Sequence, residues 1–471
     1  MVVGASVGRA VHGARESQVD RHFEGVVFTL AHIGVLAFQA RRPGPRQRLV
    51  GPSESLPMTS SFAPEGPATA EAEDGGTSAP VKAASGPSSS AYARVAALLH
   101  EARREAPGQV GAFLVGRAAD FGMSDLSVYV TDFEQRRLVP IVGSTAVGSL
   151  DMDDSSGGRS YTTARQVVEP ADGGERLWSV VIDGAARLGV MCVTMPTVDD
   201  DARALGDSLA GVVAALLVTR GQCTDAYTTL RRTQKFSLAA EMQWDLLPPL
   251  SLDSGRVSVA GLIQPAYEVG GDSFDYAVNG DTLDFAVFDA MGHGLRSSQL
   301  AHLAVSSYRH SRRSDLDLEA MYQAMDAAVA ARSDQDEFVT CMIGRLDLLD
   351  GHLAWINVGH PLPFLVRAGE VVGHLSCAPT FPAGLGLDGV TEIAHDVLQP
   401  GDRLFCITDG VVDSHRPGSE DFGEERLTEL LSAQSRAGLD AAETVRQLSH
   451  TVLDHHGVLS DDTTAFLVDL H

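Results

Sequence analysis

Lysine is almost missing from this 471-residue chain, in which Lys82 and Lys235 are the only two. The basic residues are therefore nearly all arginine, and acidic residues outnumber basic ones by 62 to 36. The imbalance is strongest in residues 250–471, which hold 34 acidic residues against 13 arginines. A surface of this charge repels phosphate backbones. The composition therefore excludes a nucleic-acid-binding surface in that region and leaves solvated acidity or bound cations.

Cysteine is also sparse, and long apolar runs are missing. The five cysteines are scattered without CxxC spacing, which excludes a disulfide framework or a zinc site and predicts a reducing, cytoplasmic location. The best membrane candidate, residues 26–40, is about 15 residues long and contains His32. This is short of the roughly 20 residues that a spanning helix needs, so we expect no stable membrane insertion.

The chain divides into four parts by composition and periodicity. Residues 1–90 form an N-terminal segment and linker rich in Ser, Pro, Gly and Ala, predicted to be disordered, with Met58 as a candidate downstream start. Residues 91–221 run from a helix through short strands to a closing helix, which indicates an α+β domain. Residues 222–249 are predicted as a linker helix that ends at two prolines.

Residues 250–471 contain longer β-rich runs, interrupted by helical stretches. Two stacked sheets flanked by helices would accommodate them. In the linker helix, Leu238, Met242 and Leu246 are four residues apart, so we expect them to line one face.

Four acidic motifs occur in this last region, each at a strand end or tight turn. In residues 282–290, Asp289 shares its parity with Leu283, Phe285 and Val287, so the apolar face of a strand would deliver its carboxylate. The other three motifs contain Asp409 before a glycine, the pair Asp461 and Asp462, and Asp272 after two glycines. Because an unpaired buried charge is costly, these carboxylates must be neutralised by protons, basic partners or metal ions.

Divalent cations are the favoured solution, because the region has no lysine and none of the four motifs contains an arginine. Oxygen ligands suit Mg²⁺ or Mn²⁺. Two such ions can lower the pKa of a shared water and hold a phosphoryl group for in-line attack. Asp289 would then lie between the metals, and the following loop would turn the carbonyl of Ala290 towards an ion or its water.

Residues 91–221 resemble a GAF domain, with LGVMCVTMP (188–196) and the following helix matching its last strand and helix. The resemblance implies either a sensor for an unknown small-molecule or protein signal or a dimerising scaffold without a ligand, and a homodimer is compatible with both.

The motifs of the C-terminal region follow one another in a fixed order: GGDSFD (270–275), DAMGHG (289–294), NVGHP (357–361), TDG (408–410), FGEERL (422–427) and DDTT (461–464). This series closely resembles the bacterial PP2C-like serine phosphatases of the RsbU and SpoIIE type, over residues 246–471. The resemblance implies a PP2C-like α-β-β-α sandwich and a phosphoserine/phosphothreonine protein phosphatase that uses two Mn²⁺ or Mg²⁺ ions.

The resemblance also assigns roles to individual residues. Asp289 is the bridging ligand, Asp409 and Asp461 complete one metal site, and Asp272 forms the second site with the carbonyl of Ala290. By the same resemblance, Asp462, Asp275 and Asp413 are expected to support the ligands.

Two histidines are candidates for the acid that protonates the leaving serine oxygen, because imidazole titrates near neutrality. His293 is assigned as catalytic. For His360, hydrogen bonding to the loops around the site is the favoured role.

By resemblance, the substrate is a phosphorylated anti-sigma-factor antagonist of the STAS type in a partner-switching pathway. The alternative is a catalytically inactive PP2C-like docking module. A nucleotide cyclase is disfavoured, because Ser273 follows Asp272 and the downstream motifs have no place in that fold.

Overall fold

Three antiparallel sheets organise the residues that the structure describes. In this computed structural model, those residues are 89–141, 148–184, 186–268, 270–332, 337–387, 389–413, 422–456 and 462–471. The predictions for residues 1–88, including the apolar run 26–40 and Met58, therefore lie outside the described residues, and so does Asp461.

The N-terminal sheet has six strands in the order β3-β2-β1-β6-β5-β4. Their bounds are Asp125–Thr131 (β1), Arg137–Pro140 (β2), Leu150–Asp151 (β3), Val167–Ala171 (β4), Gly174–Asp183 (β5) and Ala186–Met195 (β6). The helical segments of this part are Ser89–Ala102 (α2), Pro107–Gln109 (η1), Val110–Arg117 (α3), Ala118–Phe121 (η2), Ser156–Thr163 (α4) and Asp200–Gly221 (α5). One face of the sheet packs against α2, α3 and α5, and the other contacts α4. This arrangement confirms the α+β class predicted for residues 91–221.

Helix α5 begins where the sequence places a cap. The side chain of Asp199 accepts a hydrogen bond from the backbone N–H of Ala202 at 2.9 Å, and Asp200 and Asp201 favour the positive end of the helix dipole. Among the described helices, only α5 has the length and hydropathy of a membrane span, but 56% of its apolar window is buried. Its contacts with the sheet are those of a core helix.

The predicted linker helix is interrupted, which corrects the prediction of a single helix over residues 222–249. The structure has α6 (Ala226–Arg231) and α7 (Leu238–Leu246), separated by non-helical backbone that starts at Arg232. The break has one local and one distant cause. Ser237 caps α7 by accepting from the backbone N–H of Ala240, and Thr233 donates two hydrogen bonds to the hydroxyl of Tyr267, 34 positions downstream.

The face of α7 also differs from the prediction. Leu238 is 63% exposed, whereas Ala239, Ala240, Gln243 and Leu246 are buried. The cap at Ser237 sets where α7 starts, and the buried side is set by packing rather than by the spacing of the larger apolar residues.

The C-terminal region contains two sheets, in the orders β15-β12-β11-β10-β9 and β14-β13-β16-β17-β8-β7. The first-sheet strands are Asp272–Asn279 (β9), Thr282–Ala290 (β10), Val339–Asp347 (β11), His352–Val358 (β12) and Ala394–Val397 (β15). The second-sheet strands are Ser251–Asp253 (β7), Val257–Gln264 (β8), Phe364–Arg367 (β13), Glu370–His374 (β14), Arg403–Ile407 (β16) and Thr463–Leu470 (β17). The helices are Leu295–Arg313 (α8), Leu318–Ala330 (α9), Gly410–Asp413 (α10), Gly423–Arg436 (α11) and Ala441–His456 (α12).

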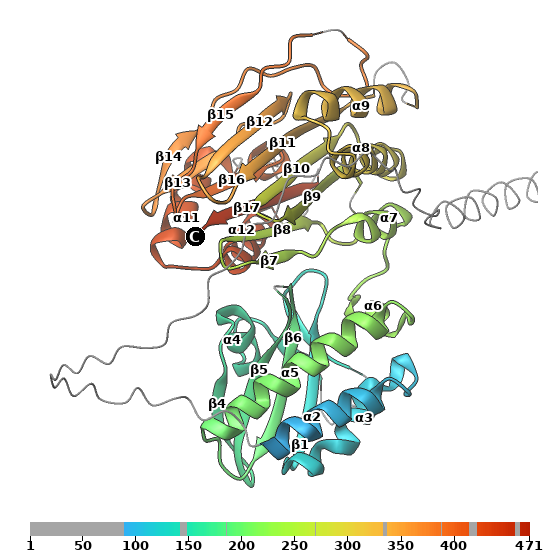
Figure 1. Ribbon diagram of the computed structural model, residues 1–471, viewed down its shortest axis with the longest axis vertical. Helices are drawn as coiled ribbons and strands as arrows, with labels where there is room; N and C mark the ends of the chain where they lie inside the picture. The colour runs from blue at the N-terminus through green and yellow to red at the C-terminus, as the bar shows by residue number, and fades with distance from the viewer. Residues whose placement is uncertain are drawn as a thin grey trace, which may run out of the picture. The chain divides into compact units, whose positions relative to one another are not determined.

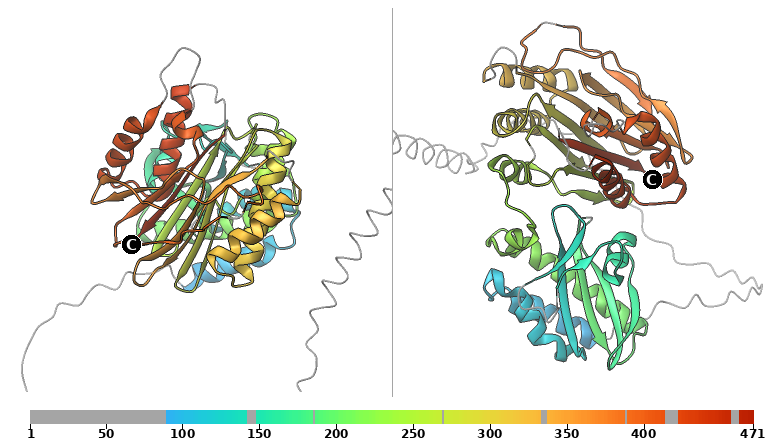
Figure 2. Two further views of the ribbon diagram at one scale, coloured as in Figure 1. Left: turned by 90° about the horizontal axis from the view of Figure 1, so that it is seen from above. Right: turned by 180° about the vertical axis from the view of Figure 1, so that it is seen from behind.

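These elements form four layers. Helices α8 and α9 cover the outer face of the first sheet, and α11 and α12 cover the outer face of the second, as Figures 1 and 2 show. A separate core of large apolar side chains fills the space between the sheets. The order helix, sheet, sheet, helix agrees with the predicted sandwich.

Strand β10 shows how the sequence pattern sets the faces of the first sheet. Leu283, Phe285 and Val287 lie in the core between the sheets, whereas Ala286 and Phe288 face the helices. The predicted alternation is confirmed, and it places the side chain of Asp289 on the inter-sheet side at the end of the strand.

Candidate functional site

Two predicted ligands lie opposite each other at one end of the first sheet. Asp272 begins β9, Asp289 comes just before the end of β10, and the two residues are partners in the antiparallel register. Directly opposed residues carry their side chains on the same face. Asp272 is 2% exposed and Asp289 is half-buried, so the hairpin presents a pair of carboxylates at the edge of the inter-sheet core.

Asp272 is held by two threonines of the second sheet. Its Oδ2 accepts hydrogen bonds from Thr408 Oγ1 at 2.6 Å and from Thr464 Oγ1 at 2.7 Å. Burial, followed by the nearby charges of Asp289 and Asp462, raises the pKa of Asp272 well above its usual range. The site therefore disfavours a full set of negative charges unless a cation balances them.

The two threonines are functional residues that the sequence reasoning missed. In β16, Leu404 and Cys406 face the inter-sheet core, and Phe405 and Ile407 face the helices. Thr408 then donates to Asp272 across the sheets. Thr408 and Thr464 lie inside the TDG and DDTT motifs, so the hydroxyl residues within the acidic motifs were the available signal.

Asp462 fixes the loop before Asp272. Its Oδ2 accepts from the backbone N–H groups of Gly270 at 2.7 Å and Gly271 at 2.6 Å. A Cβ at Gly271 would lie 2.4 Å from the carbonyl oxygen of Ala290. Glycine is required at position 271 because the backbone of the loop packs directly against the end of β10.

The carbonyl of Ala290 accepts a hydrogen bond from Ser297 Oγ at 2.8 Å, and the N–H of Ala290 donates to the carbonyl of Gly271 at 3.1 Å. A carbonyl oxygen has two lone pairs. Ser297 uses one of them, so the predicted role of the Ala290 carbonyl as a metal ligand stays compatible with this contact.

Asp409 lies in the turn after β16, and its side chain is exposed. The next residue, Gly410, packs on the backbone of Asp462, where a Cβ would lie 2.0 Å from the carbonyl oxygen. The TDG and DDTT turns are therefore in contact, although Asp461 itself lies outside the described residues. Among the described residues, no three His, Cys, Asp or Glu side chains form a group that could hold a metal ion. The structure thus brings Asp272 and Asp289 together but leaves the predicted ligand set incomplete.

The two candidate histidines have different surroundings. His293 is exposed in the loop that follows β10. His360 is buried, its backbone N–H donates to Asn357 Oδ1 at 2.8 Å, and its Nδ1 lies 3.2 Å from Thr340 Oγ1. Burial lowers the pKa of His360 to about 4. His360 is therefore neutral at physiological pH and packs within the loops.

Asp275 is neutralised by arginines. It is buried on β9, and its carboxylate accepts from Arg309 Nη2 at 2.6 Å and from Arg312 Nη1 at 2.8 Å, both on α8. Arg309 also donates to the carbonyl of Leu246 at the end of α7. Both arginines lie more than thirty positions downstream of Asp275 and outside the acidic motifs, so the motif sequences do not predict this pairing.

Comparisons with known proteins match the C-terminal part of the chain. Residues 279–471 match the family described as stage II sporulation protein E. Protein IcfG of Synechocystis sp. is 30% identical over 131 residues, which cover 28% of this chain and 20% of that protein. Stage II sporulation protein E of Bacillus subtilis is 22% identical over 205 residues, covering 42% of this chain and 24% of that protein. These alignments span about a quarter or less of each of the two relatives.

Solved structures with similar folds include the SiaA-PP2C domain of Pseudomonas aeruginosa, with a TM-score of 0.42 and 19% identity over 50% of this chain and 94% of that one. Another is the PPM Ser-Thr phosphatase MsPP of Mycobacterium smegmatis in complex with cacodylate, with a TM-score of 0.35 and 17% identity over 46% of this chain and 99% of that one. The match to the stage II sporulation protein E family thus covers residues 279–471, which is less than half of the chain and lies within the C-terminal region.

Proposed function

We propose that the C-terminal domain removes phosphate from serine or threonine side chains of a protein substrate and that it uses two Mn²⁺ or Mg²⁺ ions. The observation that carries this proposal is the opposed pair of Asp272 and Asp289 at the sheet edge. The family match over residues 279–471, which includes Asp289, Asp409 and Asp461, supports it.

The donor set fits a hard divalent cation. Asp272 and Asp289 supply carboxylate oxygens, and Ala290 supplies a carbonyl oxygen. Burial and then the charges of Asp289 and Asp462 raise the pKa of Asp272, and a nearby cation would favour its charged form. When bound, the ions would supply the positive charge that lowers the pKa of the attacking water and neutralises the phosphoryl group. Asp409 and Asp461 are the proposed remaining ligands.

The protein's own contribution is to hold these oxygens in place. Thr408 and Thr464 fix the carboxylate of Asp272, and Ser297 fixes the carbonyl of Ala290. Partners of this kind orient metal ligands and typically change metal affinity or activity 10–100-fold. His293, exposed in the adjoining loop, is the proposed donor of a proton to the leaving serine oxygen.

We further propose that the substrate is a phosphorylated anti-sigma-factor antagonist of the STAS type and that the protein acts in the cytoplasm. The order of the acidic motifs supports this substrate class. Residues 91–221 are proposed to be a GAF-like regulatory domain, which the six-stranded antiparallel sheet with its flanking helices supports.

The test is release of phosphate from p-nitrophenyl phosphate and from phosphorylated antagonist proteins, with and without Mn²⁺. Asp289→Asn should lower turnover about a thousandfold or more, because the shared carboxylate is lost. Asp281→Asn is the matched control: Asp281 lies in the turn at the other end of the same hairpin, is exposed, and pairs with Arg256 at 3.2 Å. The control should retain full activity.

The alternative is a docking module without catalysis. It predicts that the unaltered chain binds the phosphorylated protein but releases no phosphate with either metal, and that outcome would overturn the proposed activity.

A further inference from the structure

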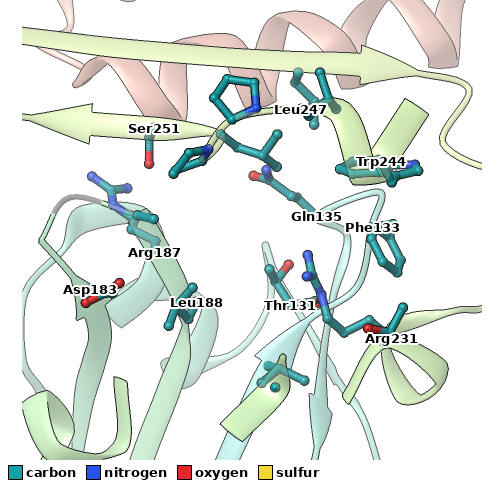
Figure 3. A pocket seen from close by; sticks show the side chains of 18 of the residues that line it. Thr131, Phe133, Gln135, Asp183, Arg187, Leu188, Arg231, Trp244, Leu247 and Ser251 are labelled. Atoms are coloured by element: carbon teal, nitrogen blue, oxygen red, sulfur yellow. Dashed lines mark hydrogen bonds between the residues drawn. The ribbon is translucent and has the colours of Figure 1, made fainter. Parts of the chain in front are cut away.

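We propose that a cavity between the N-terminal sheet and the C-terminal domain binds a small molecule that joins an apolar body to one anionic group. The cavity has a volume of about 520 Å³, within the range of about 300–1,000 Å³ that is typical of small-molecule sites. Residues from Ser89 onwards belong to one compact unit, and elements of both domains line the cavity (Figure 3).

Most of the wall is apolar. Leu188 of β6 and Leu217 of α5 contribute from the N-terminal domain, and Leu247, Pro248 and Val445 contribute from the linker and α12. Figure 3 shows Leu188 on one side of the cavity and Leu247 on the other. Such a surface favours an apolar ligand body, because contact removes it from water.

Arg231 supplies the polar anchor. Its Nε donates to the carbonyl of Thr131 at 2.8 Å, and its guanidinium carbon lies 4.3 Å from the centre of the Phe133 ring. Among the described residues, no carboxylate forms an ion pair with Arg231. The charge of Asp132 interacts with the guanidinium electrostatically, without ion-pair contact. Burial lowers the pKa of Arg231, which is the direction expected for a cation that lacks a close counter-charge.

The other two arginines of the wall already have partners. Arg187 pairs with Asp440, and Arg446 pairs with Glu443 and Asp153. Arg231 is therefore the cation that a ligand would neutralise.

Three acidic residues also border the cavity. Glu241 pairs with Arg232 at 2.7 Å, whereas Asp183 and Asp245 are exposed. Solvated charges are screened by water and salt, so they oppose a buried anion only weakly. A carboxylate or a phosphate would satisfy the guanidinium with charge-assisted hydrogen bonds.

The cavity is connected to the carboxylate pair. Trp244 lines the cavity and donates from Nε1 to the carbonyl of Ala266 at 2.8 Å. Tyr267 follows, packs in one aromatic cluster with Phe133, Phe236 and Trp244, and precedes the loop that leads to Asp272. A bound ligand would therefore change phosphatase turnover. This consequence rests on the proposed function, whereas the binding of the ligand is independent of it.

The test is calorimetric titration of the full chain in EDTA with indole-3-acetate and with phenylphosphonate, two non-hydrolysable probes that differ in their anionic group. EDTA removes divalent ions, so phenylphosphonate cannot report on the metal site. We expect saturable binding of at least one probe, and which one binds decides between a carboxylate and a phosphoryl ligand. Indole has only the apolar body and inorganic phosphate has only the anionic group, so each should bind much more weakly.

Arg231→Gln should weaken binding about tenfold or more, because the charge-assisted hydrogen bonds are lost. Arg232→Gln is the matched control, since Arg232 pairs with Glu241, stacks on Phe236 and does not line the cavity. Arg231→Lys keeps the charge and should bind within a fewfold of the unaltered chain. Val218→Trp, which fills the cavity from α5, should abolish binding through an independent change.

Saturable binding that is lost in Arg231→Gln and Val218→Trp but kept in Arg232→Gln supports the site. Failure of both probes to bind the unaltered chain, or equal binding by Arg231→Gln, overturns it. The regulatory consequence is read separately, as a change in p-nitrophenyl phosphate turnover with Mn²⁺ when the probe saturates the site. An unchanged rate at saturation overturns that consequence and leaves the binding site standing, and an inactive enzyme overturns the proposed function alone.

Discussion

The carboxylate edge and the junction cavity each bring charged groups together from distant parts of the chain. At the edge, Asp272, Asp289 and Asp462 come from three strands or strand ends, and burial, followed by repulsion from the other two carboxylates, raises the pKa of Asp272. In the cavity, Arg231 is the charge without an ion-pair partner among the described residues. Both places hold charge that the protein balances only in part, and each therefore points to a ligand of opposite sign.

The two regions differ in how well they can be predicted from the sequence. At the edge, each acid belongs to a short motif with glycines or hydroxyl residues beside it. The cavity is lined by ordinary apolar residues spread over both domains. A site can be predicted from the sequence when its characteristic residues are neighbours in the chain. It cannot be predicted when only the tertiary fold brings common residues together.

A change at Asp275 should have the largest effect on stability. Asp275 lies on the same strand as Asp272, but its charge is balanced by arginines of the protein. Asp275→Asn would leave Arg309 and Arg312 without their partner, so we expect a loss of about 3 kcal/mol in the free energy of unfolding. Urea denaturation of the C-terminal transition measures it. A loss below about 1 kcal/mol would contradict the view that Asp275 is balanced within the protein.

The threonines test whether the edge depends on positioning as well as charge. The double change Thr408→Val and Thr464→Val removes both hydroxyl donors to Asp272 and should weaken Mn²⁺ activation about 10–100-fold. Activity as a function of Mn²⁺ concentration measures it. Thr463→Val is the control, because Thr463 Oγ1 donates to the carbonyl of Gln264 instead. Equal effects of the control and the double variant would remove the special role of the two hydroxyls.

Acid should destabilise both regions to a similar extent. Burial lowers the pKa of His360, near the edge, and of His450, on α12, to about 4. The folded state therefore disfavours the charged imidazoles, and stability that is complete above pH 6.5 is lost as the pH falls from 6.5 towards 4. Between pH 7 and 5 each histidine should remove about 2 kcal/mol.

Unfolding at several pH values, for the unaltered chain and for His450→Gln, measures this loss. His450 Nε2 donates to the carbonyl of Glu134 at 2.7 Å, while Nδ1 faces Arg446 Nη1 at 3.2 Å, so a second proton would meet a guanidinium. The variant should lose about half of the acid sensitivity. An unchanged pH profile would show that His450 does not titrate as described.

Tyr267→Phe should have the smallest effect. It removes the hydroxyl that accepts two half-buried hydrogen bonds from Thr233. We expect this loss to lower the free energy of unfolding by about 1 kcal/mol. We expect about a threefold change in turnover at saturating Mn²⁺, because the aromatic packing remains. Steady-state kinetics would detect it, and the idea that Tyr267 links the linker to the Asp272 loop fails if kcat and KM both stay unchanged.

Much of the C-terminal architecture follows from the sequence alone. Alternation in β10 identified the side of the sheet on which Asp289 lies, and the strand-rich pattern indicated the paired sheets. The pairing of Asp275 with α8 could not be anticipated, because helix packing decides which arginine reaches a buried acid. The break in the linker helix also depends on a distant residue, since the Tyr267 hydroxyl accepts two hydrogen bonds from Thr233, which follows the end of α6.

The turn between β9 and β10 consists of Gly280 and Asp281. Its length sets the register of the hairpin, in which Thr282 lies opposite Asn279 and Asp289 lies opposite Asp272. Inserting or deleting a single residue there would rotate one strand's side chains to the other face. Asp272 and Asp289 would both survive in the sequence, yet they would no longer meet. Homologues with altered hairpin length are thus expected to have lost the activity even where every acidic motif persists.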